Sequence, residues 1–428
     1  MAITKENEEA VKKIVEESFL KEYLASDTIT DISYNGSELF VQDNVTGRYK
    51  TNKQPTYEEV EMLGKKIADE TNHQWTQADP VLDTEFHYYR VNFVHDAASP
   101  YGCTFALRVS KPRQAIASLK DLADEDVEGL LKILVQAELG IIVSGRTGSG
   151  KTELQKSLVG YINDMKKITL IEDTMDSHLK KLYPTKDINS FRVLLGEQRQ
   201  QELTYQDLIK ASLRNNPDYI IVAETRGSEA YDMLQASMTD HAIITTIHAT
   251  GAEAIPSRLL SMIAQDYDIN ESRLGADIVK HLRFGVHMSL EMMEDGIKRF
   301  IGEVVEFVDF QDGRTVSNVL YREKKSYDAI AETYHSDKEY GSLSRQTKEH
   351  LHKVRLSHLV PPIFMEKEQM EEPLDAKVEK EGFMVVESKQ VNKLTSEQVN
   401  GLTGKHENIK EEKTSDKASE TKAKLLNI

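Results

Sequence analysis

Residues 145–152, with the letters GRTGSGKT, have the composition of a phosphate-binding loop. Glycines let a backbone adopt positive φ and approach phosphate oxygens closely. The N–H groups that open the following helix then point at the anion. The residues expected to bind a nucleotide are Gly145, Thr147, Gly148, Ser149, Gly150, Lys151 and Thr152. Lys151 is expected to reach the β- and γ-phosphates of ATP, and Thr152 to bind Mg²⁺.

The segments on either side of this loop favour the same interpretation. Residues 139–143 read as a strand that enters the loop. Leu154, Leu158 and Ile162 share one face of a helix that leaves it. The alternative is a Gly- and Ser-rich turn that matches by chance, but such a turn would not explain why a strand precedes it and a helix follows it.

Polar residues follow three other apolar runs, each at the point where a strand is expected to end. The carboxyl ends of parallel strands meet in one crevice, where ligands bind. The three runs and the polar residues after them are 168–171 with Glu172 and Asp176, 219–222 with Glu224, and 243–247 with His248.

Hydrolysis of Mg-ATP needs carboxylates that hold the metal and orient the attacking water. Glu224 is expected to coordinate Mg²⁺ indirectly and polarise water, and Glu172 and Asp176 are candidates for the base. His248 is expected to sense the γ-phosphate. The alternatives are a helix cap or solvated turn for each acid, including Asp173, and a structural histidine.

Periodicity indicates two kinds of fold along the chain. A helix over 4–25, short strands within 31–41, a helix over 57–72 and strands within 84–110 indicate a small α+β region. From about residue 125 helices and strands alternate, which predicts a parallel sheet covered by helices. Late strands are expected within 284–320, with a turn at Asp312-Gly313.

Composition limits the kinds of partner. The net charge of −17 argues against nucleic-acid binding through bulk positive charge, although a local basic groove stays open. Cys103 is the only cysteine, so no internal disulfide and no Cys-pair zinc site can form. No signal peptide and no apolar run of about 20 residues is present, so we expect a cytoplasmic protein whose membrane contact is peripheral at most.

Three further stretches give the sequence a family resemblance. Residues 171–176 resemble an Asp box, 213–230 an atypical Walker B segment and 240–250 a His box. In this order they resemble the traffic (secretion) ATPases of type II and type IV secretion, type IV pili and conjugation. Arg226, within the second stretch, is therefore included among the expected nucleotide contacts. The sequence departs from the family pattern at Asp176, Ala223 and Asp240, where Glu, Gly and Gly are usual.

The N-terminal region indicates which branch of the family the sequence resembles. Residues 31–36, 90–92 and 106–108 look like the first domain of the branch that serves type IV secretion and tight-adherence pili. In that branch arginines of this domain reach the nucleotide, which implicates Arg90 and Arg108; the alternative is ordinary surface arginines. The single cysteine agrees with this branch, because many type II motors carry a tetracysteine zinc module.

The resemblance implies an α/β protein with a RecA-like P-loop ATPase domain at 116–330, after an α+β domain at 1–115. A C-terminal helical extension is expected at 331–365. A polar tail at 366–428 is expected to be disordered, because it cannot bury enough apolar surface, with partner binding as the alternative.

The function implied is a Mg-ATP-hydrolysing ring, usually a hexamer, that powers type IV secretion, conjugative transfer or pilus assembly. It would work with inner-membrane components of such a machine, without evident direct DNA binding. The alternative is a nucleotide-binding switch or scaffold with little turnover. An ABC-type ATPase is rejected because residues 194–198 lack the serine-glycine core of its signature, and a helicase because the chain is acidic.

Overall fold

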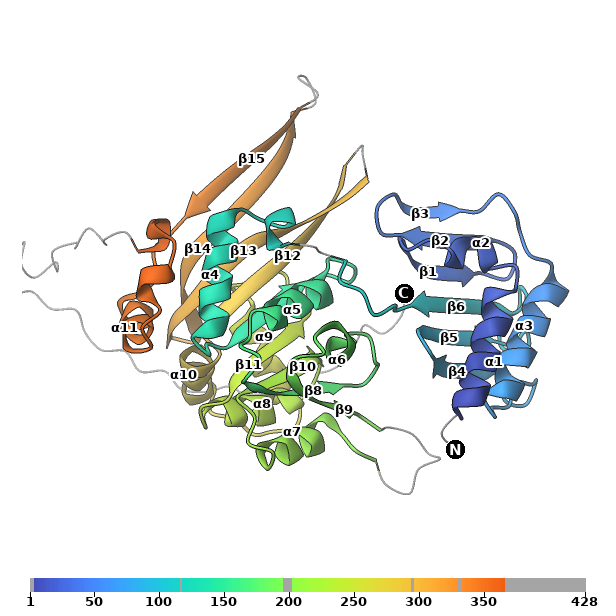
Figure 1. Cartoon of the computed structure of the whole chain (residues 1–428), viewed down its shortest axis with the longest axis horizontal. Helices are drawn as coiled ribbons and strands as arrows, with labels where there is room; N and C mark the ends of the chain where they lie inside the picture. The colour runs from blue at the N-terminus through green and yellow to red at the C-terminus, as the bar shows by residue number, and fades with distance from the viewer. Residues whose placement is uncertain (1–3, 116–117, 195–201, 294–295, 329–332, 366–428) are drawn as a thin grey trace, which may run out of the picture. The chain divides into compact units, whose positions relative to one another are not determined.

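The computed structural model describes residues 4–115, 118–194, 202–293, 296–328 and 333–365 (Figure 1). The elements of the N-terminal region are α1 (Lys5–Glu16), α2 (Lys21–Leu24), β1 (Ile29–Tyr34), β2 (Leu39–Asp43), β3 (Gly47–Lys50), α3 (Tyr57–Glu70), β4 (Val81–Phe86), β5 (Tyr89–Val94) and β6 (Thr104–Val109). The strands form an antiparallel sheet in the order β3-β2-β1-β6-β5-β4. The expected α+β region is therefore present.

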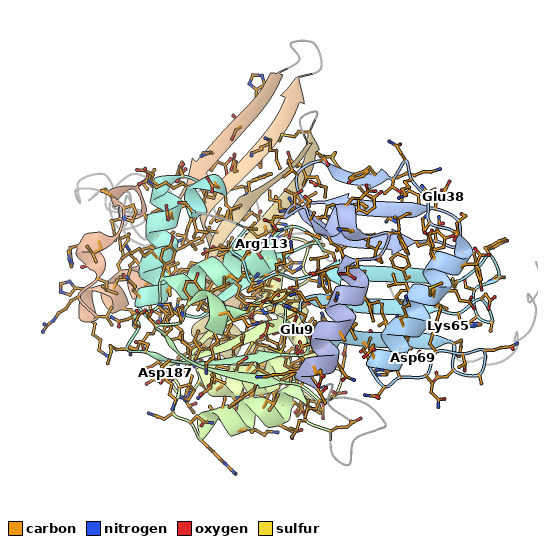
Figure 2. The ribbon with its side chains drawn as sticks, turned by 45° about the vertical axis from the view of Figure 1, so that its right-hand side comes forward. Glu9, Glu38, Lys65, Asp69, Arg113 and Asp187 are labelled. Carbon is orange, nitrogen blue, oxygen red and sulfur yellow. The ribbon has the colours of Figure 1, made fainter. Side chains whose placement is uncertain are left out.

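Helices α1 and α3 pack against each other and cover this sheet (Figure 1). On α3, Leu63 and Ile67 are buried, while Lys65 and Asp69 point outward (Figure 2). The 3.6-residue period puts these two pairs on opposite faces of the helix. Cys103 is buried in the same core, and burial raises the pKa of its thiol to about 11.

The prediction of one helix over 4–25 is wrong in its second half. Helix α1 ends at Glu16, and the short α2 starts at Lys21. Between them the Ser18 hydroxyl donates to the Val15 carbonyl at 2.7 Å and accepts from the Leu20 N–H at 3.2 Å. A serine that bonds its neighbouring backbone in this way competes with the helical ladder.

The second region contains a mixed sheet. Its elements are η1 (Leu119–Asp121), α4 (Glu125–Gln136), β7 (Ile141–Gly145), α5 (Lys151–Gly160), β8 (Lys167–Glu172), α6 (Leu179–Leu182), β9 (Asp187–Arg192), α7 (Tyr205–Leu213), β10 (Tyr219–Thr225), α8 (Glu229–Ser237), β11 (Ala242–Ile247), α9 (Ile255–Ile263), α10 (Glu271–His281), β12 (Phe284–Met293), β13 (Gly296–Gln311), β14 (Arg314–Asp328), β15 (Thr333–Tyr340), α11 (Arg345–Lys353), η2 (Ser357–Leu359) and η3 (Pro362–Phe364). The order is β15-β14-β13-β12-β7-β11-β10-β8-β9. From β12 to β9 every pair is parallel, as the alternation predicted.

Both faces of the parallel part are buried, which explains its continuous apolar runs. Along β7, Ile141 and Val143 belong to one core cluster, and Ile142, between them, belongs to the other. Along β11, Ile243 and Ile244 divide in the same way. Successive side chains of a strand point to opposite faces, so a strand covered by helices on both sides must be apolar at every position.

In the last four strands, β12 to β15, each strand is antiparallel to the next. The predicted turn at Asp312-Gly313 lies between β13 and β14, with both residues at positive φ. The helical prediction for 331–365 is wrong at its start, where β15 extends the sheet before α11 begins. The domain boundaries stay predictions, and the prediction for 366–428 lies outside the described residues.

Among the described residues, no helix is both long enough and apolar enough to cross a membrane.

Candidate nucleotide site

The glycine-rich loop begins where β7 ends, at a position that requires glycine. A Cβ on Gly145 would lie 2.6 Å from the Met288 carbonyl oxygen and 2.5 Å from the Ser149 hydroxyl oxygen. Thr147 and Gly148 are exposed at the tip of the loop, while Ser149 is buried. The loop therefore presents its backbone at the surface beside the carboxyl ends of the parallel strands.

Helix α5 begins at Lys151 without a side-chain cap from the described residues, after Gly150 in the left-handed conformation. Several other helices are capped by a hydroxyl, carboxylate or amide side chain, at Thr4, Thr56, Asp124, Thr204, Asn270 and Ser344. An uncapped N-terminus leaves N–H groups and the positive end of the helix dipole for an anion. Helices α2, α6, α8 and α9 also lack a side-chain cap among the described residues, so it is the glycine-rich loop before α5 that marks this N-terminus as a candidate phosphate site.

Lys151 folds back into the loop. Its side chain is largely buried, and Nζ donates to the carbonyl oxygens of Gly145 at 3.0 Å and Arg146 at 3.3 Å. Burial lowers the pKa of Lys151, and the nearby Glu224 carboxylate opposes that shift. The ammonium group is thus held by two neutral carbonyls, contacts that a phosphate could replace with stronger ones.

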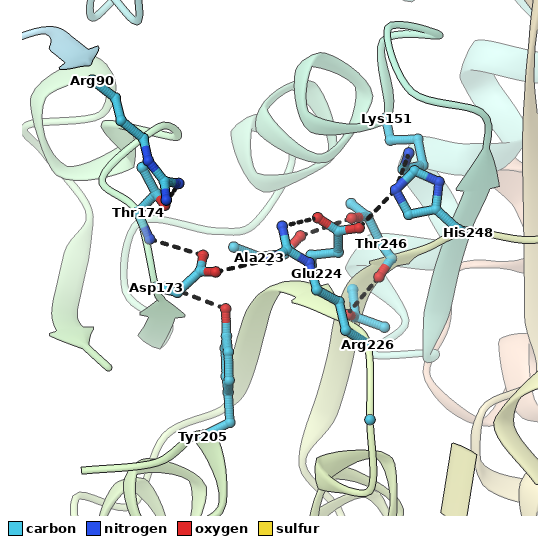
Figure 3. Close-up of polar contacts among 12 residues, drawn as sticks. Arg90, Lys151, Asp173, Thr174, Tyr205, Ala223, Glu224, Arg226, Thr246 and His248 are labelled. Carbon is cyan, nitrogen blue, oxygen red and sulfur yellow. Dashed lines mark hydrogen bonds and ion pairs between the residues drawn. The ribbon is translucent and has the colours of Figure 1, made fainter. Parts of the chain in front are cut away.

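Glu224 and His248 lie beside Lys151 (Figure 3). His248 Nε2 is 2.8 Å from Glu224 Oε1 and 3.5 Å from Lys151 Nζ. The sheet order explains this, because β11 pairs with β7 on one side and with β10 on the other. The three strand ends that carry the loop, His248 and Glu224 are therefore adjacent. The ends of β7, β10 and β11 converge as the sequence predicted.

One oxygen of Glu224 lacks a hydrogen-bond donor among the described residues. Oε1 is buried, and although His248 Nε2 is close enough for an ion pair, the contact lacks hydrogen-bond geometry. Oε2 accepts from Arg226 Nη2 at 2.6 Å. A buried carboxylate oxygen without a donor is costly unless something else satisfies it. Water or a hydrated metal ion is suited to that position.

Arg226 joins Glu224 to a second acid. Its Nη1 donates to Asp173 Oδ2 at 3.0 Å, and the adjacent Asp173 N–H donates to the Tyr205 hydroxyl at 3.1 Å. The hydrogen bond to Glu224 raises the pKa of Arg226. Asp173 also accepts from the Thr174 N–H at 2.8 Å, so it makes a local backbone contact as well as the ion pair with Arg226. Arg226 therefore lies between two carboxylates at the end of β10 and β8.

Two neighbours hold Glu224 at an irregular strand end. The pairing of β10 with β11 shifts register between Val222 and Thr225, and the Thr246 hydroxyl donates to the Ala223 carbonyl there at 2.8 Å. Gln155 of α5 is fully buried, and its amide donates to the carbonyls of Val222 at 3.0 Å and Ile244 at 3.3 Å. The helix that carries the phosphate loop is thereby tied to both strands that carry Glu224 and His248.

The other two predicted acids are placed differently. Strand β8 is separated from β7 by β11 and β10, which at about 4.8 Å per strand step amounts to about 14 Å. Among the described residues no hydrogen bond or ion pair joins Glu172 or Asp176 to Lys151, Glu224 or His248, although β8 pairs with β10, the strand that carries Glu224. Glu172 instead accepts from the Ser177 N–H at 3.0 Å, and the Asp176 carbonyl accepts from the Ser110 hydroxyl. Their role as base stays a prediction.

Burial raises the pKa of Glu172 to about 7, and the hydrogen bond from the Ser177 N–H opposes that shift. Below about pH 4.5 the carboxyl is protonated in folded and unfolded chains alike; as the pH rises to about 7 it ionises first in the unfolded chain. The folded state therefore loses stability over that window. We expect the free energy of unfolding of Glu172→Gln, taken relative to the wild type at each pH, to rise by about 1–3 kcal/mol from about pH 4.5 to about pH 8.

Thermal or urea unfolding of the nucleotide-free proteins across this pH range measures that difference. Other titrating groups cancel when the two proteins are compared at each pH, and the glutamine side chain of the variant keeps an acceptor for the Ser177 N–H. A difference that stays constant with pH would contradict the raised pKa.

The two N-terminal arginines make separate contacts. Arg90 Nη1 donates to the Thr174 hydroxyl at 3.0 Å, beside Asp173 (Figure 3). Arg108 Nε donates to Asp31 at 3.1 Å, with both side chains substantially exposed. The structure thus brings Arg90 to the network around Asp173, whereas Arg108 keeps the contact of a surface arginine. A phosphate contact stays a prediction for both.

The donor set fits Mg-nucleotide better than a metal held by protein alone. Among the described residues no group of three or more His, Cys, Asp or Glu side chains could hold a metal ion. Mg²⁺ usually keeps several waters and takes one or two protein ligands together with substrate phosphates. Here the glycine-rich loop offers such a site, together with the buried Ser149 hydroxyl and Glu224 Oε1, neither of which has a hydrogen-bond partner among the described residues.

Comparisons with known proteins agree with this geometry. The family model of type II/IV secretion system proteins matches residues 89–356. An uncharacterized protein of Bacillus anthracis, pXO2-25, is 30% identical over 346 residues, which cover 78% of this chain and 75% of that protein. The type IV secretion system protein VirB11 of Brucella suis is 27% identical over 348 residues, covering 70% and 92%.

The X-ray structure of the Legionella pneumophila ATPase DotB is similar in fold, with a TM-score of 0.51 and 20% identity over 85% of this chain and 90% of that one. The family model alone matches more than half of the chain and includes the loop, Glu224 and His248. The resemblance predicted from the sequence is thereby confirmed, and the chain belongs to the type II/IV secretion system protein family, with a RecA-like α/β fold.

Proposed function

We propose that the chain hydrolyses Mg-ATP at residues 145–152 and works as a ring motor of a type IV secretion, conjugation or pilus machine. The observation that carries the proposal is the contact of His248 with both Glu224 and Lys151. It puts a carboxylate and an imidazole next to the ammonium group of a phosphate-binding loop. Phosphoryl transfer relies on such positioned charges more than on covalent chemistry.

Each residue of the site has a distinct role in the proposed reaction. Backbone N–H groups at the start of α5 bind phosphate oxygens, and Lys151 exchanges its two carbonyl contacts for the β- and γ-phosphates. Glu224 orients the attacking water through Oε1, which accepts no hydrogen bond from the described residues. Thr152 and Glu224 would hold Mg²⁺, Glu224 through water, and the ion would neutralise charge on the phosphates.

His248 is suited to sensing the γ-phosphate. Its Nε2 lies between a cation and a carboxylate, so it can accept from Lys151 or donate to Glu224, and it cannot do both at once. If Lys151 moves toward a phosphate, the contact of His248 with Lys151 weakens and its contact with Glu224 is favoured. Arg226 extends the same network to Asp173 at the end of β8, and Arg90 connects the adjacent Thr174 to the N-terminal region. Nucleotide binding can therefore be coupled to a change in conformation.

The assembly and its place in the cell are proposed here from the family resemblance. Brucella VirB11 is a type IV secretion system protein and Legionella DotB an ATPase. On that basis we include a homo-oligomer, with a hexamer as the expected ring, cytoplasmic location, and inner-membrane components of the machine as partners. DNA, protein and pilin remain equally suitable cargoes.

A nucleotide-binding switch with little turnover is the second candidate. Arg226 is bonded to Glu224 at 2.6 Å, so the carboxylate already has a cationic partner. If that ion pair persists when nucleotide binds, Glu224 is less able to activate water, and binding alters shape without turnover.

Phosphate release by the full-length protein distinguishes the two functions. We expect steady release with Mg-ATP, loss of release in EDTA, and a specific rate that rises with protein concentration as the ring assembles. Tight Mg-ATP binding without release at any concentration would favour the switch and contradict the motor.

A further inference from the structure

A basic side chain of strand β13 contacts the phosphate loop, and the sequence of the loop does not predict this contact. Arg299 Nε donates to the Gly148 carbonyl at 2.8 Å, and its Nη1 donates to the Asn44 carbonyl at 2.8 Å. Arg299 pairs across the sheet with Leu290 of β12, which itself runs beside β7. The β12–β13 hairpin thus carries Arg299 alongside the tip of the loop.

The contact fixes one particular peptide unit. In a trans peptide the carbonyl and the following N–H point in opposite directions. Here the Gly148 carbonyl accepts from Arg299, and the N–H of the same unit, on Ser149, donates to the Arg146 carbonyl at 3.2 Å. The unit is therefore held from both sides.

Without Arg299 only the bond from the Ser149 N–H to the Arg146 carbonyl, at 3.2 Å, would hold this peptide unit among the described residues. Turning this unit over rotates ψ of Gly148 and φ of Ser149, and Gly148, whose φ of 78° already lies in the region that favours glycine, puts no Cβ in the way of that rotation. Turned the other way, the carbonyl would direct its negative end into the loop, where an anion would bind, and would repel it. A donor that holds the carbonyl outward removes this competing conformation before the ligand arrives.

We infer that Arg299 is a positioning residue of the phosphate loop, which keeps the Gly148 carbonyl turned away from bound phosphate. The inference rests on the proposed phosphate site and goes beyond its predicted ligands. The side chain also packs against the loop, because its Cδ lies 3.5 Å from where a Cβ on Gly150 would be. Through Asn44 the same guanidinium links the loop to the turn between β2 and β3.

The test compares Arg299→Met and Arg299→Lys with the wild type, using Mg-ADP as the probe in calorimetric titrations of the full chain. Methionine keeps much of the length and loses every donor. Lysine keeps the charge and one donor for the Gly148 carbonyl. We expect Arg299→Met to bind Mg-ADP about 10- to 100-fold more weakly and Arg299→Lys to recover affinity to within about threefold of the wild type.

Arg345→Gln on α11 is the control, since it removes one exposed positive charge outside the site. The unfolding temperature of each nucleotide-free variant is measured in parallel. The inference would be overturned if Arg299→Met bound Mg-ADP as tightly as the wild type. It would also be overturned if Arg299→Met and Arg299→Lys lost affinity equally and both had a lowered unfolding temperature. Absence of Mg-ADP binding by the wild type would instead refute the phosphate site itself, whereas binding without hydrolysis would refute only the motor.

Discussion

Replacing Glu224 by glutamine is expected to lower phosphate release from Mg-ATP by about 10²- to 10⁴-fold, the range for loss of a positioned base. Glutamine keeps the size of the side chain and a carbonyl acceptor for Arg226. It removes the negative charge that faces His248 Nε2 at 2.8 Å and that would polarise water. Affinity for Mg-ATP should stay within about tenfold of the wild type, because Lys151 and the loop backbone supply most phosphate contacts.

Steady-state phosphate release and equilibrium binding, measured on the same preparation, separate these two effects. Glu349→Gln is the matched control, because this exposed glutamate pairs with Arg345 on α11, outside the site. Retention of more than about a tenth of the wild-type rate in Glu224→Gln would assign the base to another acid. Glu172 and Asp176 at the end of β8 would then be the next variants to measure.

Replacing Lys151 by methionine is expected to weaken Mg-ATP binding by about 10- to 150-fold, equivalent to one lost charge-assisted hydrogen bond of about 1.5–3 kcal/mol. Phosphate release should become undetectable, because the same ammonium also faces the γ-phosphate in the reaction. The nucleotide-free variant should be no less stable than the wild type. Lys151 is a largely buried cation with a lowered pKa, and its removal relieves a desolvation cost.

Titration with Mg-ATP and thermal unfolding without nucleotide test both parts of this prediction. Lys353→Met, at an exposed position in the last turn of α11, controls for loss of one positive charge. Unchanged affinity in Lys151→Met would show that phosphate binds elsewhere. A large fall in unfolding temperature would show that Lys151 serves the fold.

Much of the site could be predicted from the sequence, because its parts follow local rules. The loop needs glycines at fixed spacing, and polar residues directly after apolar runs indicate the ends of parallel strands. Both signals are contained in a few consecutive residues, and the sheet order then brings Glu224 and His248 to Lys151. The prediction needed only that β7, β10 and β11 be neighbours.

The positioning contacts could not be predicted in this way, because they join residues far apart in the chain. Gln155 reaches the carbonyls of Val222 and Ile244, and Arg299 reaches Gly148. For Gln155 the available signal was a polar residue next to Leu154, on a helix in which the neighbouring residues are buried. Arg299 stands in an alternating strand, where a basic residue usually faces solvent.

Several elements were also missed for physical reasons. Strands β3 and β9 are short or polar, with mostly exposed positions in β3, and their pairing with longer neighbours stabilises them. Strand β15 has a polar sequence, TYHSDKEY, without the apolar alternation of a half-buried strand. It forms through its antiparallel ladder with β14, the strand directly before it in the chain, which its own polar pattern does not reveal.

The central claim is that the glycine-rich loop, Glu224 and His248 form one hydrolytic site. Its most direct test is an experimental structure of the full-length protein with Mg²⁺ and a non-hydrolysable ATP analogue. We predict the β- and γ-phosphates within loop 145–152, with Lys151 Nζ moved from the Gly145 carbonyl onto them and Glu224 facing the hydrated Mg²⁺ and the γ-phosphate. Phosphates bound outside the loop, or Glu224 and His248 turned away from the γ-phosphate, would contradict the account.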